Sequence, residues 1–307
     1  ERAQGLFRFK ALMETHFEEL ASLVTREHGK TLAESRGEIR RGIEVVEFAC
    51  GAPSLLMGES TENISRGIDC DTVRQPMGVS ASICPFNFPF MVPLWSLPIS
   101  LACGGKPAVD TLLSHPKVAT VSVVGSTPVA RYIYETAAGY GKRVQAAGGA
   151  KNYMVLMPDA DMDAALGAVM GSAYGCAGER CMAGAVLVCV GGSGEQFLPQ
   201  LCQLASEWRV GPTDRDPRVQ MGPVISPEHR DRVVKAMADA EAEGAEILVD
   251  GRDLKVGAAP DGFYVGPTVL NNVTPTMETA QTEIFGPVLS VMHVDDLAAT
   301  RGSSATK

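Results

Sequence analysis

The sequence has no run of basic residues and no long, uninterrupted apolar stretch. Its 36 acidic and 27 basic side chains give a net charge of −9, which argues against a nucleic-acid-binding protein. The most apolar stretch, 88–103, is interrupted by Pro89, Pro93 and Pro98, so we expect no membrane span. No signal peptide is visible, and a cytoplasmic location is expected. The chain opens inside a helical pattern at Glu1, which leaves the mitochondrial matrix open.

The eight cysteines form no Cys-x-x-Cys pair and have no zinc-like spacing with the five histidines. The sequence therefore predicts no metal site and indicates reduced thiols in an intracellular protein. Hydrophobic residues make up 45% of the chain and charged residues 21%, as in ordinary globular proteins. The length of 307 residues suggests about two domains.

Helix-like and strand-like segments alternate along most of the chain. Helices are expected at 4–28 and 32–49, and a helix that is apolar on all sides, and so buried, at 91–103. Two strands, 70–75 and 79–84, are expected to form a hairpin. Further along, strands are expected at 118–124, 143–146, 153–157, 185–190, 246–249 and 288–293, and helices at 125–138, 161–174, 196–207 and 227–243. This alternation predicts an α/β fold with a parallel sheet.

A segment of mostly small residues, Gly175 to Ala183, contains a candidate nucleophile, Cys181. Its small neighbours let other atoms approach the thiol. A thiol attacks as the thiolate, and the positive charge of the adjacent Arg180 would favour that form. The alternative is a buried structural cysteine, which is a common fate of an intracellular thiol.

Two further segments hold groups that suit an acyl-transfer site. The side-chain amide of Asn87, in Pro85-Phe86-Asn87-Phe88-Pro89, is a candidate donor to an oxyanion, a contribution of ~10²–10³ in rate. The alternative for Asn87 is a turn residue. Gly125 and Ser126 follow a strand and open a helix with Pro128, and such a helix start attracts phosphate. This turn is not the usual G-x-G-x-x-G fingerprint.

These segments, together with Glu283-Ile284-Phe285-Gly286-Pro287, resemble the aldehyde dehydrogenase superfamily. The resemblance implies the aldehyde dehydrogenase fold: a Rossmann-like cofactor domain, an α/β catalytic domain and a small oligomerisation hairpin. It implies catalytic roles for Cys181 and Asn87. It also implies contacts with NAD for Pro85, Phe86, Lys106, Gly125, Ser126, Glu283 and Phe285. The alternative for Glu283 is a surface carboxylate in a Gly-Pro turn.

The chain is short relative to that superfamily. Between Cys103 and Asp110 a few residues stand where the family has a strand, a Lys-Pro motif, a helix and a further strand, and a βαβ unit needs ~30 residues or more. A helix is expected directly afterwards at 110–114. We expect a cofactor-binding domain at 1–147, with an oligomerisation hairpin at about 68–84 and an internal gap near 104–109, and a catalytic domain at 148–307 that lacks its C-terminal part. The hairpin implies a homodimer or homotetramer.

The informative departure from the family is Ala147, in Ala146-Ala147-Gly148-Gly149-Ala150-Lys151-Asn152. The resembled segment, Glu-Leu-Gly-Gly-Lys, has at this place the Glu that activates the hydrolytic water. A general base is worth ~10²–10⁴ in rate, so hydrolysis would be handicapped. A thiol acceptor, with a pKa of ~8.5, is already partly thiolate near neutrality. The sequence therefore favours release of the acyl group by coenzyme A, as in the CoA-acylating methylmalonate-semialdehyde dehydrogenases that it resembles. These also lack the Glu and usually carry Asn there.

The substrates of that branch carry a carboxylate beside the aldehyde, and arginine binds such an anion with a fork of donors. Arg180 and Arg41 match the two arginines that the family uses. The alternative for Arg41 is a place on the solvated basic face of its helix, with Arg36 and Arg40. We expect NAD-dependent oxidation of malonate or methylmalonate semialdehyde through a thioester. The alternatives are a hydrolysing aldehyde dehydrogenase with a base elsewhere, and a catalytically dead dehydrogenase-like binding protein.

Overall fold

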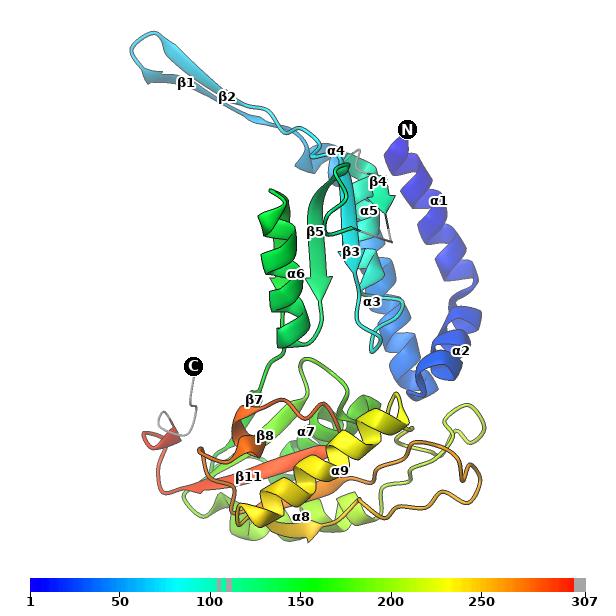
Figure 1. Cartoon of the computed structure of the whole chain (residues 1–307), viewed down its shortest axis with the longest axis vertical. Coiled ribbons are helices and arrows are strands. Elements are labelled where there is room, and N and C mark those ends of the chain that lie inside the picture. Colours follow the sequence, from blue (N-terminus) through cyan, green and yellow to red (C-terminus); the bar gives the residue numbers. More distant parts are fainter. Residues whose placement is uncertain (104–105, 109–111, 301–307) are drawn as a thin grey trace. The chain divides into compact units, whose positions relative to one another are not determined.

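The computed structural model describes residues 1–103, 106–108 and 112–300. The chain divides into two compact units. The first comprises Glu1–Ala21 and Arg36–Gly149, and the second comprises Ser22–Ser35 and Ala150–Lys307. Each unit contains a β-sheet flanked by helices (Figure 1). No helix within the described ranges is long and apolar enough to cross a membrane.

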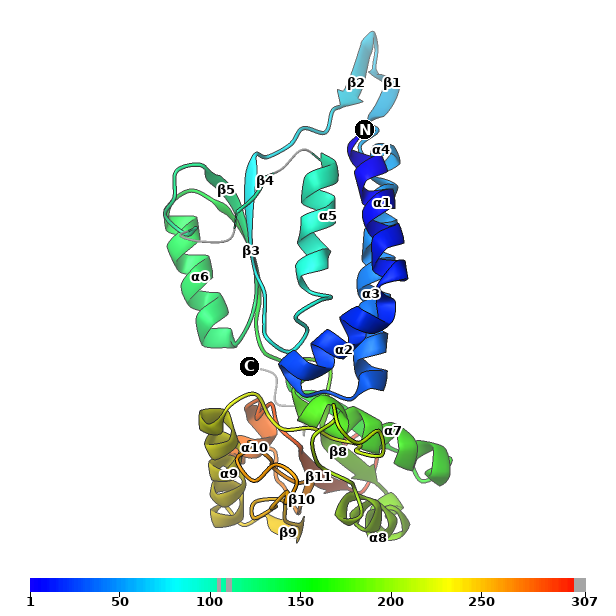
Figure 2. The same cartoon turned by 90° about the vertical axis from the view of Figure 1, so that its right-hand side faces the viewer.

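A four-stranded parallel sheet forms the centre of the first unit. Its strands are β3 (Val79–Ile83), β4 (Lys106–Ala108), β5 (Val118–Val124) and β6 (Arg143–Ala147), in the order β4-β3-β5-β6. Helix α6 (Thr127–Gly139) covers one face and α5 (Pro93–Cys103) lies on the other (Figure 2). Val121 of β5 packs with Ile133 and Ala137 of α6, which are four residues apart and therefore share one side of the helix. The parallel arrangement expected for 118–124 and 143–146 is confirmed.

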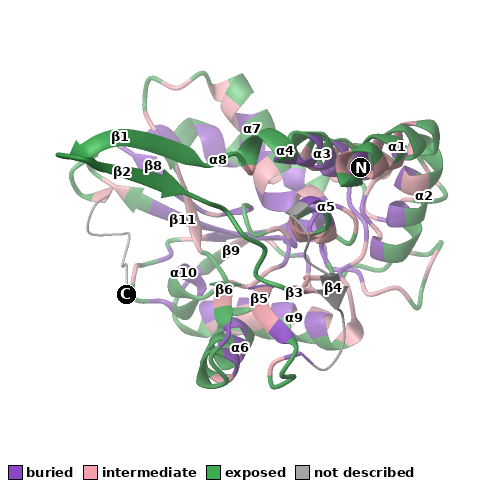
Figure 3. Ribbon diagram, turned by 90° about the horizontal axis from the view of Figure 1, so that it is seen from above, coloured by how far each residue is buried: buried purple, intermediate pink, exposed green. Residues whose placement is uncertain are grey.

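The predicted pairing of 70–75 with 79–84 is wrong. The hairpin is formed by β1 (Glu59–Ser65) and β2 (Ile68–Thr72), which pair antiparallel, whereas β3 joins the parallel sheet. Every residue of β1 and β2 is exposed (Figure 3). Strand β1 lacks the alternation of apolar and polar residues that marks a half-buried strand, so its sequence pattern gave no signal.

Helices form in the first half of the chain where they were predicted, but their bounds differ from the predicted ones. The expected helix 4–28 is two helices, α1 (Arg2–Thr15) and α2 (Phe17–His28), whereas α3 (Leu32–Cys50) is confirmed and a short α4 (Ala52–Leu55) follows it. Helix α5 is not wholly buried, because Trp95 and Leu101 are exposed. The predicted gap near 104–109 and the predicted helix at 110–114 lie partly outside the described residues, which leave out 104–105, 109–111 and 301–307. Residues 112–114 are described and are not helical.

A five-stranded sheet, in the order β7-β8-β11-β10-β9, forms the centre of the second unit. Its strands are β7 (Asn152–Leu156), β8 (Gly184–Val190), β9 (Glu246–Val249), β10 (Thr268–Asn271) and β11 (Val288–Val294). All neighbours are parallel except β9 and β10. The flanking helices are α7 (Met162–Tyr174), α8 (Ser193–Ser206), α9 (Pro227–Ala242) and the short α10 (Glu278–Gln281). Strand β10 and helix α10 were not expected.

Alternate residues of β8 face opposite layers of helices. Leu187 packs in a core with residues of α7 and α8, whereas Val186 and Val188 pack in another core with Val233 of α9. Successive side chains of a strand point to opposite faces, so both faces of β8 are buried. This explains its nearly continuous apolar sequence, which is typical of parallel sheets.

The loops that hold the predicted site residues lie at one edge of each sheet. In the first unit, residues 84–92 and 125–126 follow the carboxyl ends of β3 and β5. In the second unit, residues 175–183 and 282–287 precede the amino ends of β8 and β11. Parallel strands place equivalent ends at the same edge, so the loops of each set are neighbours.

Helix α2 ends at His28, which is buried in the second unit. Burial and, less strongly, the charge of Lys30 lower the pKa of His28 from 6.5 to about 3. Between these two values the unfolded chain binds one proton more than the folded chain, so the free energy of unfolding falls as the pH falls. When the pH is lowered from about 6.5 to about 5, the free energy of unfolding should fall by about 2 kcal/mol less in His28→Gln than in the unmodified chain.

Denaturant unfolding at each pH measures this difference, and His16→Gln is the matched control because His16 is exposed. A glutamine cannot titrate, so only the His28 variant should flatten the pH dependence. Equal losses of stability in His28→Gln and in the unmodified chain would contradict the assignment.

Candidate active site

The turn between β5 and α6 places a helix N-terminus at the carboxyl edge of the first sheet. The Gly125 N–H donates to the Ala147 carbonyl (3.1 Å), which ties the ends of β5 and β6 together. Ser126 is the N-cap residue, but its side chain makes no cap hydrogen bond. The Thr127 hydroxyl accepts from the Gly149 N–H (3.0 Å). The first N–H groups of this 13-residue helix thus have no side-chain cap, which suits an anion such as phosphate.

The loop after β3 holds Asn87 in a buried position. Asn87 is 3% exposed, whereas its neighbour Phe86 is 41% exposed and Pro85 is half-buried. The Glu38 carboxylate accepts from the Phe90 N–H (2.8 Å) and so fixes the end of this loop. A buried amide held on a fixed loop can be aimed at a reacting atom.

Arg41 differs from the neighbouring arginines of α3. Arg36 and Arg40 form ion pairs with glutamates, as expected for a solvated basic face. The guanidinium of Arg41 instead lies 5.8 Å from the centroid of the Phe88 ring. The structure thus brings Arg41 to the loop that contains Asn87. Of Lys106, the first residue of β4, only the backbone is described.

Cys181 is one of two exposed cysteines among the seven whose side chains the structure describes. The other, Cys70, lies on strand β2 of the hairpin. Burial raises the pKa of Cys176 to about 12 and that of Cys189 to about 11. Thiols with such pKa values stay protonated near neutral pH and are poor nucleophiles. Exposure therefore distinguishes Cys181 from its near neighbour Cys176.

The backbone just before Cys181 is strained. Cys176, Ala177 and Gly178 have φ values of 51°, 54° and 71°, so three consecutive residues are left-handed. For residues other than glycine this conformation costs roughly 1–2 kcal/mol each. Strain of this kind persists only where the surroundings enforce it, and it gathers at functional sites.

Two residues that were not predicted to belong to the site hold this loop. Glu34 Oε1 accepts from the Cys176 N–H (2.7 Å), while its Oε2 accepts from the Thr31 N–H (2.8 Å) in a capping box at the start of α3. Asn152 Nδ2 donates to the Cys181 carbonyl (2.8 Å). The Thr-x-x-Glu pattern signals the cap, but no local pattern signals a contact between residues 142 positions apart.

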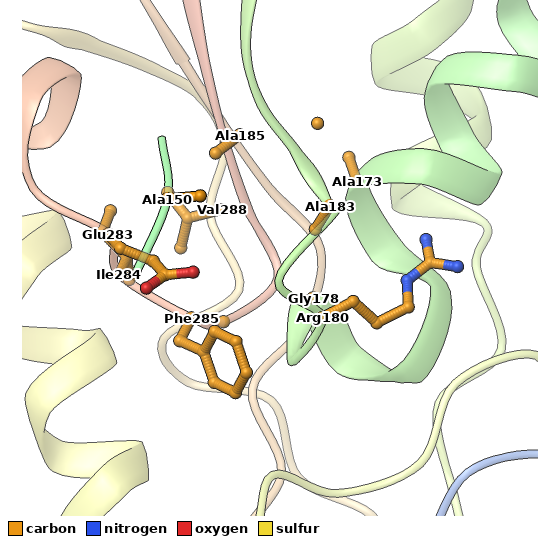
Figure 4. Close-up of a pocket in the computed structure, with 12 residues that line it drawn as sticks. Ala150, Ala173, Gly178, Arg180, Ala183, Ala185, Glu283, Ile284, Phe285 and Val288 are labelled. Atoms are coloured by element: carbon orange, nitrogen blue, oxygen red, sulfur yellow. The ribbon is translucent and has the colours of Figure 1, made fainter. Parts of the chain in front are cut away.

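The Arg180 guanidinium binds the end of helix α7. Its Nη2 donates to the carbonyls of Gly171 and Ser172, the latter at 2.9 Å. The C-terminal end of a helix attracts cations, so this is a favourable place for the charge. Figure 4 shows the side chain extending away from Glu283 and Phe285. The two bonds use Nη2 alone, so the guanidinium keeps further donors for an anion.

A pocket at the amino edge of the second sheet is lined by Glu283, Phe285, Arg180 and small residues (Figure 4). Burial raises the pKa of Glu283, and the Ala150 N–H and the charge of Lys151 oppose that rise. A carboxylate and an aromatic ring beside small residues suit a sugar hydroxyl and a flat ring. Two of the lining residues, Arg180 and Ala183, flank Cys181 in the chain.

The predicted residues thus fall into two groups, one in each unit. Arg41, Asn87 and the turn at Gly125 belong to the first unit, and Cys181 and the pocket residues belong to the second. Within 1–103, 106–108 and 112–300 no three His, Cys, Asp or Glu side chains gather as metal ligands. The second unit thus presents an exposed thiol on an α/β scaffold, and the first unit presents a helix N-terminus whose chemistry suits an anion, features that fit the class of cofactor-dependent α/β enzymes with a thiol nucleophile.

A profile of the aldehyde dehydrogenase family matches residues 1–107 and 103–300. Malonate-semialdehyde dehydrogenase 1 of Geobacillus kaustophilus is 44% identical over 334 aligned residues, which cover 97% of this chain and 68% of that protein. Among solved structures, methylmalonate-semialdehyde dehydrogenase from Oceanimonas doudoroffii matches with a TM-score of 0.93 at 44% identity, covering 98% of this chain and 70% of that one. A Sinorhizobium meliloti protein assigned as a methylmalonate-semialdehyde dehydrogenase, complexed with NAD, matches with a TM-score of 0.93 at 40% identity and covers 98% and 69%.

The chain belongs to the aldehyde dehydrogenase family. The predicted family and fold are therefore confirmed. The 334 aligned positions exceed the 307 residues of the chain, so the relative has residues within the matched region that this chain lacks. The chain spans 68% of that relative's length.

Proposed function

We propose that this chain oxidises malonate or methylmalonate semialdehyde with NAD and passes the acyl group to coenzyme A. The observation that carries the proposal is the exposed thiol of Cys181, next to a pocket-lining arginine, in a chain 44% identical to a malonate-semialdehyde dehydrogenase. The absence of a carboxylate at residue 147 supports the thiol acceptor over water, since Ala147 has no acid–base group.

In the proposed mechanism, Cys181 attacks the aldehyde carbon as the thiolate. On the family resemblance, the Asn87 amide and a backbone N–H near Cys181 would donate hydrogen bonds to the resulting oxyanion. Bound NAD would supply the hydride acceptor for this carbon, and Cys181 would then hold the acyl group as a thioester. The coenzyme A thiol then displaces Cys181, which regains a proton as acyl-CoA is formed.

The residues proposed to hold NAD fit the group chemically. The uncapped N-terminus of α6, at Gly125 and Ser126, would bind the pyrophosphate. Glu283 would bind the ribose hydroxyls, and Phe285 would pack against the cofactor ring. Pro85, Phe86 and Lys106 are proposed to contact the same cofactor on the family resemblance alone.

Product analysis tests the proposal. Malonate semialdehyde and NAD should yield an acyl-CoA when coenzyme A is present, and mass spectrometry of the products distinguishes this outcome from free acid. A steady yield of free acid without coenzyme A would identify the hydrolysing alternative instead.

Arg180 is proposed to dock the substrate carboxylate, with Arg41 as the second arginine. Arg180→Leu is expected to lower kcat/KM for malonate semialdehyde by roughly 10–100-fold, since a hydrogen bond to a charged group is worth about 1.5–3 kcal/mol. It should affect propanal, which has no carboxylate, much less. Because the substitution also removes the bonds to α7, the comparison between two substrates on the same variant separates docking from loss of stability. Equal losses on both would remove Arg180 from docking.

The hairpin of β1 and β2 is proposed to mediate a homodimer or homotetramer. Both strands are exposed along their whole length. An isolated two-stranded hairpin is marginally stable in water, so a neighbouring subunit would stabilise it. Light scattering of the chain with and without residues 59–72 tests this assignment.

A further inference from the structure

Phe285, in the wall of the pocket, has a left-handed backbone with φ of 60°. This conformation is unusual for a bulky residue and needs support from its surroundings. His229, near the start of α9, provides a contact: its Nε2 lies 2.6 Å from the Phe285 carbonyl oxygen. A carbonyl oxygen can only accept, so Nε2 must carry the proton.

The other ring nitrogen of His229 fixes the same tautomer. Arg232 Nη2 lies within hydrogen-bond distance of His229 Nδ1, and a guanidinium can only donate. His229 is therefore a neutral imidazole with its proton on Nε2. Burial lowers its pKa, the bond to Phe285 raises it, and the charge of Arg232 lowers it. Protonation would place an N–H against the guanidinium.

Glu179, two residues before Cys181, completes the cluster. It is 0% exposed, its Oε1 lies 3.3 Å from His229 Nε2, and the same oxygen accepts from the Ile225 N–H (3.1 Å). Burial raises the pKa of Glu179 to about 8, against the effects of the Ile225 N–H, Lys30 and Arg232. The cluster thus joins the loop of Cys181, the start of α9 and the pocket wall.

We propose that His229 is a positioning residue, which holds the Phe285 peptide in its left-handed conformation, and that Glu179 links His229 to the loop of Cys181, so that the pocket wall is fixed against that loop. Both side chains are buried, so neither is expected to touch the substrate. Without the Nε2–H, the Phe285 peptide would relax toward negative φ and turn Glu283 and the ring of Phe285 out of place. The kinetic consequence rests on the proposed function, because Glu283 and Phe285 are the residues proposed to hold the cofactor.

The test compares His229→Leu, which has no donor, with His229→Gln, whose side-chain amide keeps one. The matched control is His293→Gln on β11, where the native Nε2 contacts Asn271 at the surface. His229→Leu should exchange the amide hydrogens of Phe285, Gly286 and Val288 about tenfold faster and raise KM for NAD about tenfold, with a smaller change in kcat. His229→Gln should recover most of both effects, and His293→Gln should show neither.

Exchange rates and KM within about twofold of the unmodified chain in His229→Leu would overturn the proposal. If that variant does not fold, Glu179→Gln decides. Above about pH 8 a charged Glu179 would compete with the Phe285 carbonyl for the Nε2–H, so protection of 285–288 should fall with pH in the unmodified chain and not in Glu179→Gln. Identical pH dependence in both would also overturn it. Failure of the unmodified chain to form NADH would refute the proposed function and leave the exchange result standing.

Discussion

Cys181→Ala is expected to lower NADH formation from malonate semialdehyde by roughly 10⁴-fold or more, because the covalent intermediate can no longer form. Stopped-flow absorbance of NADH and the intact mass of the acyl-enzyme measure this loss. The unmodified chain should gain one acyl group, and the variant should gain none. The substitution removes an exposed thiol, so the fold should be unaffected.

Two control substitutions make the Cys181 result specific. Cys70→Ala removes the other exposed thiol among the described cysteines, and Cys176→Ala removes a buried thiol five residues before Cys181. Both should retain the acyl-enzyme. If Cys181→Ala kept activity while either control lost it, the nucleophile would have to be reassigned.

The second large effect concerns coenzyme A. Without it, enzyme, NAD and semialdehyde should give a burst of about one NADH per active site and then a steady rate lower by roughly 10²–10⁴-fold, the contribution of a general base. Residue 147 is an alanine at the end of β6, so it supplies no base for hydrolysis. Coenzyme A brings its own nucleophile and should restore continuous turnover.

The burst experiment has a clear opposite outcome. Full turnover to free acid without coenzyme A would refute thiolysis and show that another residue activates water. The variant Ala147→Glu provides a comparison, since a carboxylate there that reaches the thioester should speed the phase that is independent of coenzyme A. The size of the burst in the unmodified chain remains the deciding measurement.

Sequence pattern predicted the elements whose burial is either continuous or regularly periodic along the segment. Strands β8 and β11 are apolar runs because both faces are covered, and α3 repeats apolar residues with helical spacing. Strand β1 escaped prediction because nothing in it is buried, and β10 because four residues are too few to show a period. Strand β9 runs antiparallel to β10. The direction of a strand depends on the path of the chain that connects it to its neighbour, and no local sequence pattern specifies that path.

Candidate site residues could be named from the sequence where their chemistry is local. Cys181, Asn87 and Glu283 could be proposed because each lies in a short segment that resembles the family. Their supports were not found, because Glu34 and His229 contact loops 142 and 56 residues away. The expected effect of Arg180 on the thiol likewise overlooked the carbonyls of α7, which become neighbours of its guanidinium only after folding.

Gly178 restricts which loops of this enzyme can be exchanged for those of a relative. A Cβ at this position would lie 2.1 Å from the Gly286 carbonyl oxygen, and the backbone φ is +71°. The nucleophile loop and the Gly286 turn therefore interlock through two residues without side chains, although they are far apart in the gene. A graft that takes one loop from a relative and keeps the other native would join two surfaces that were never selected to fit. Specificity libraries built on this scaffold should vary the two loops as one cassette and leave Gly178 unchanged.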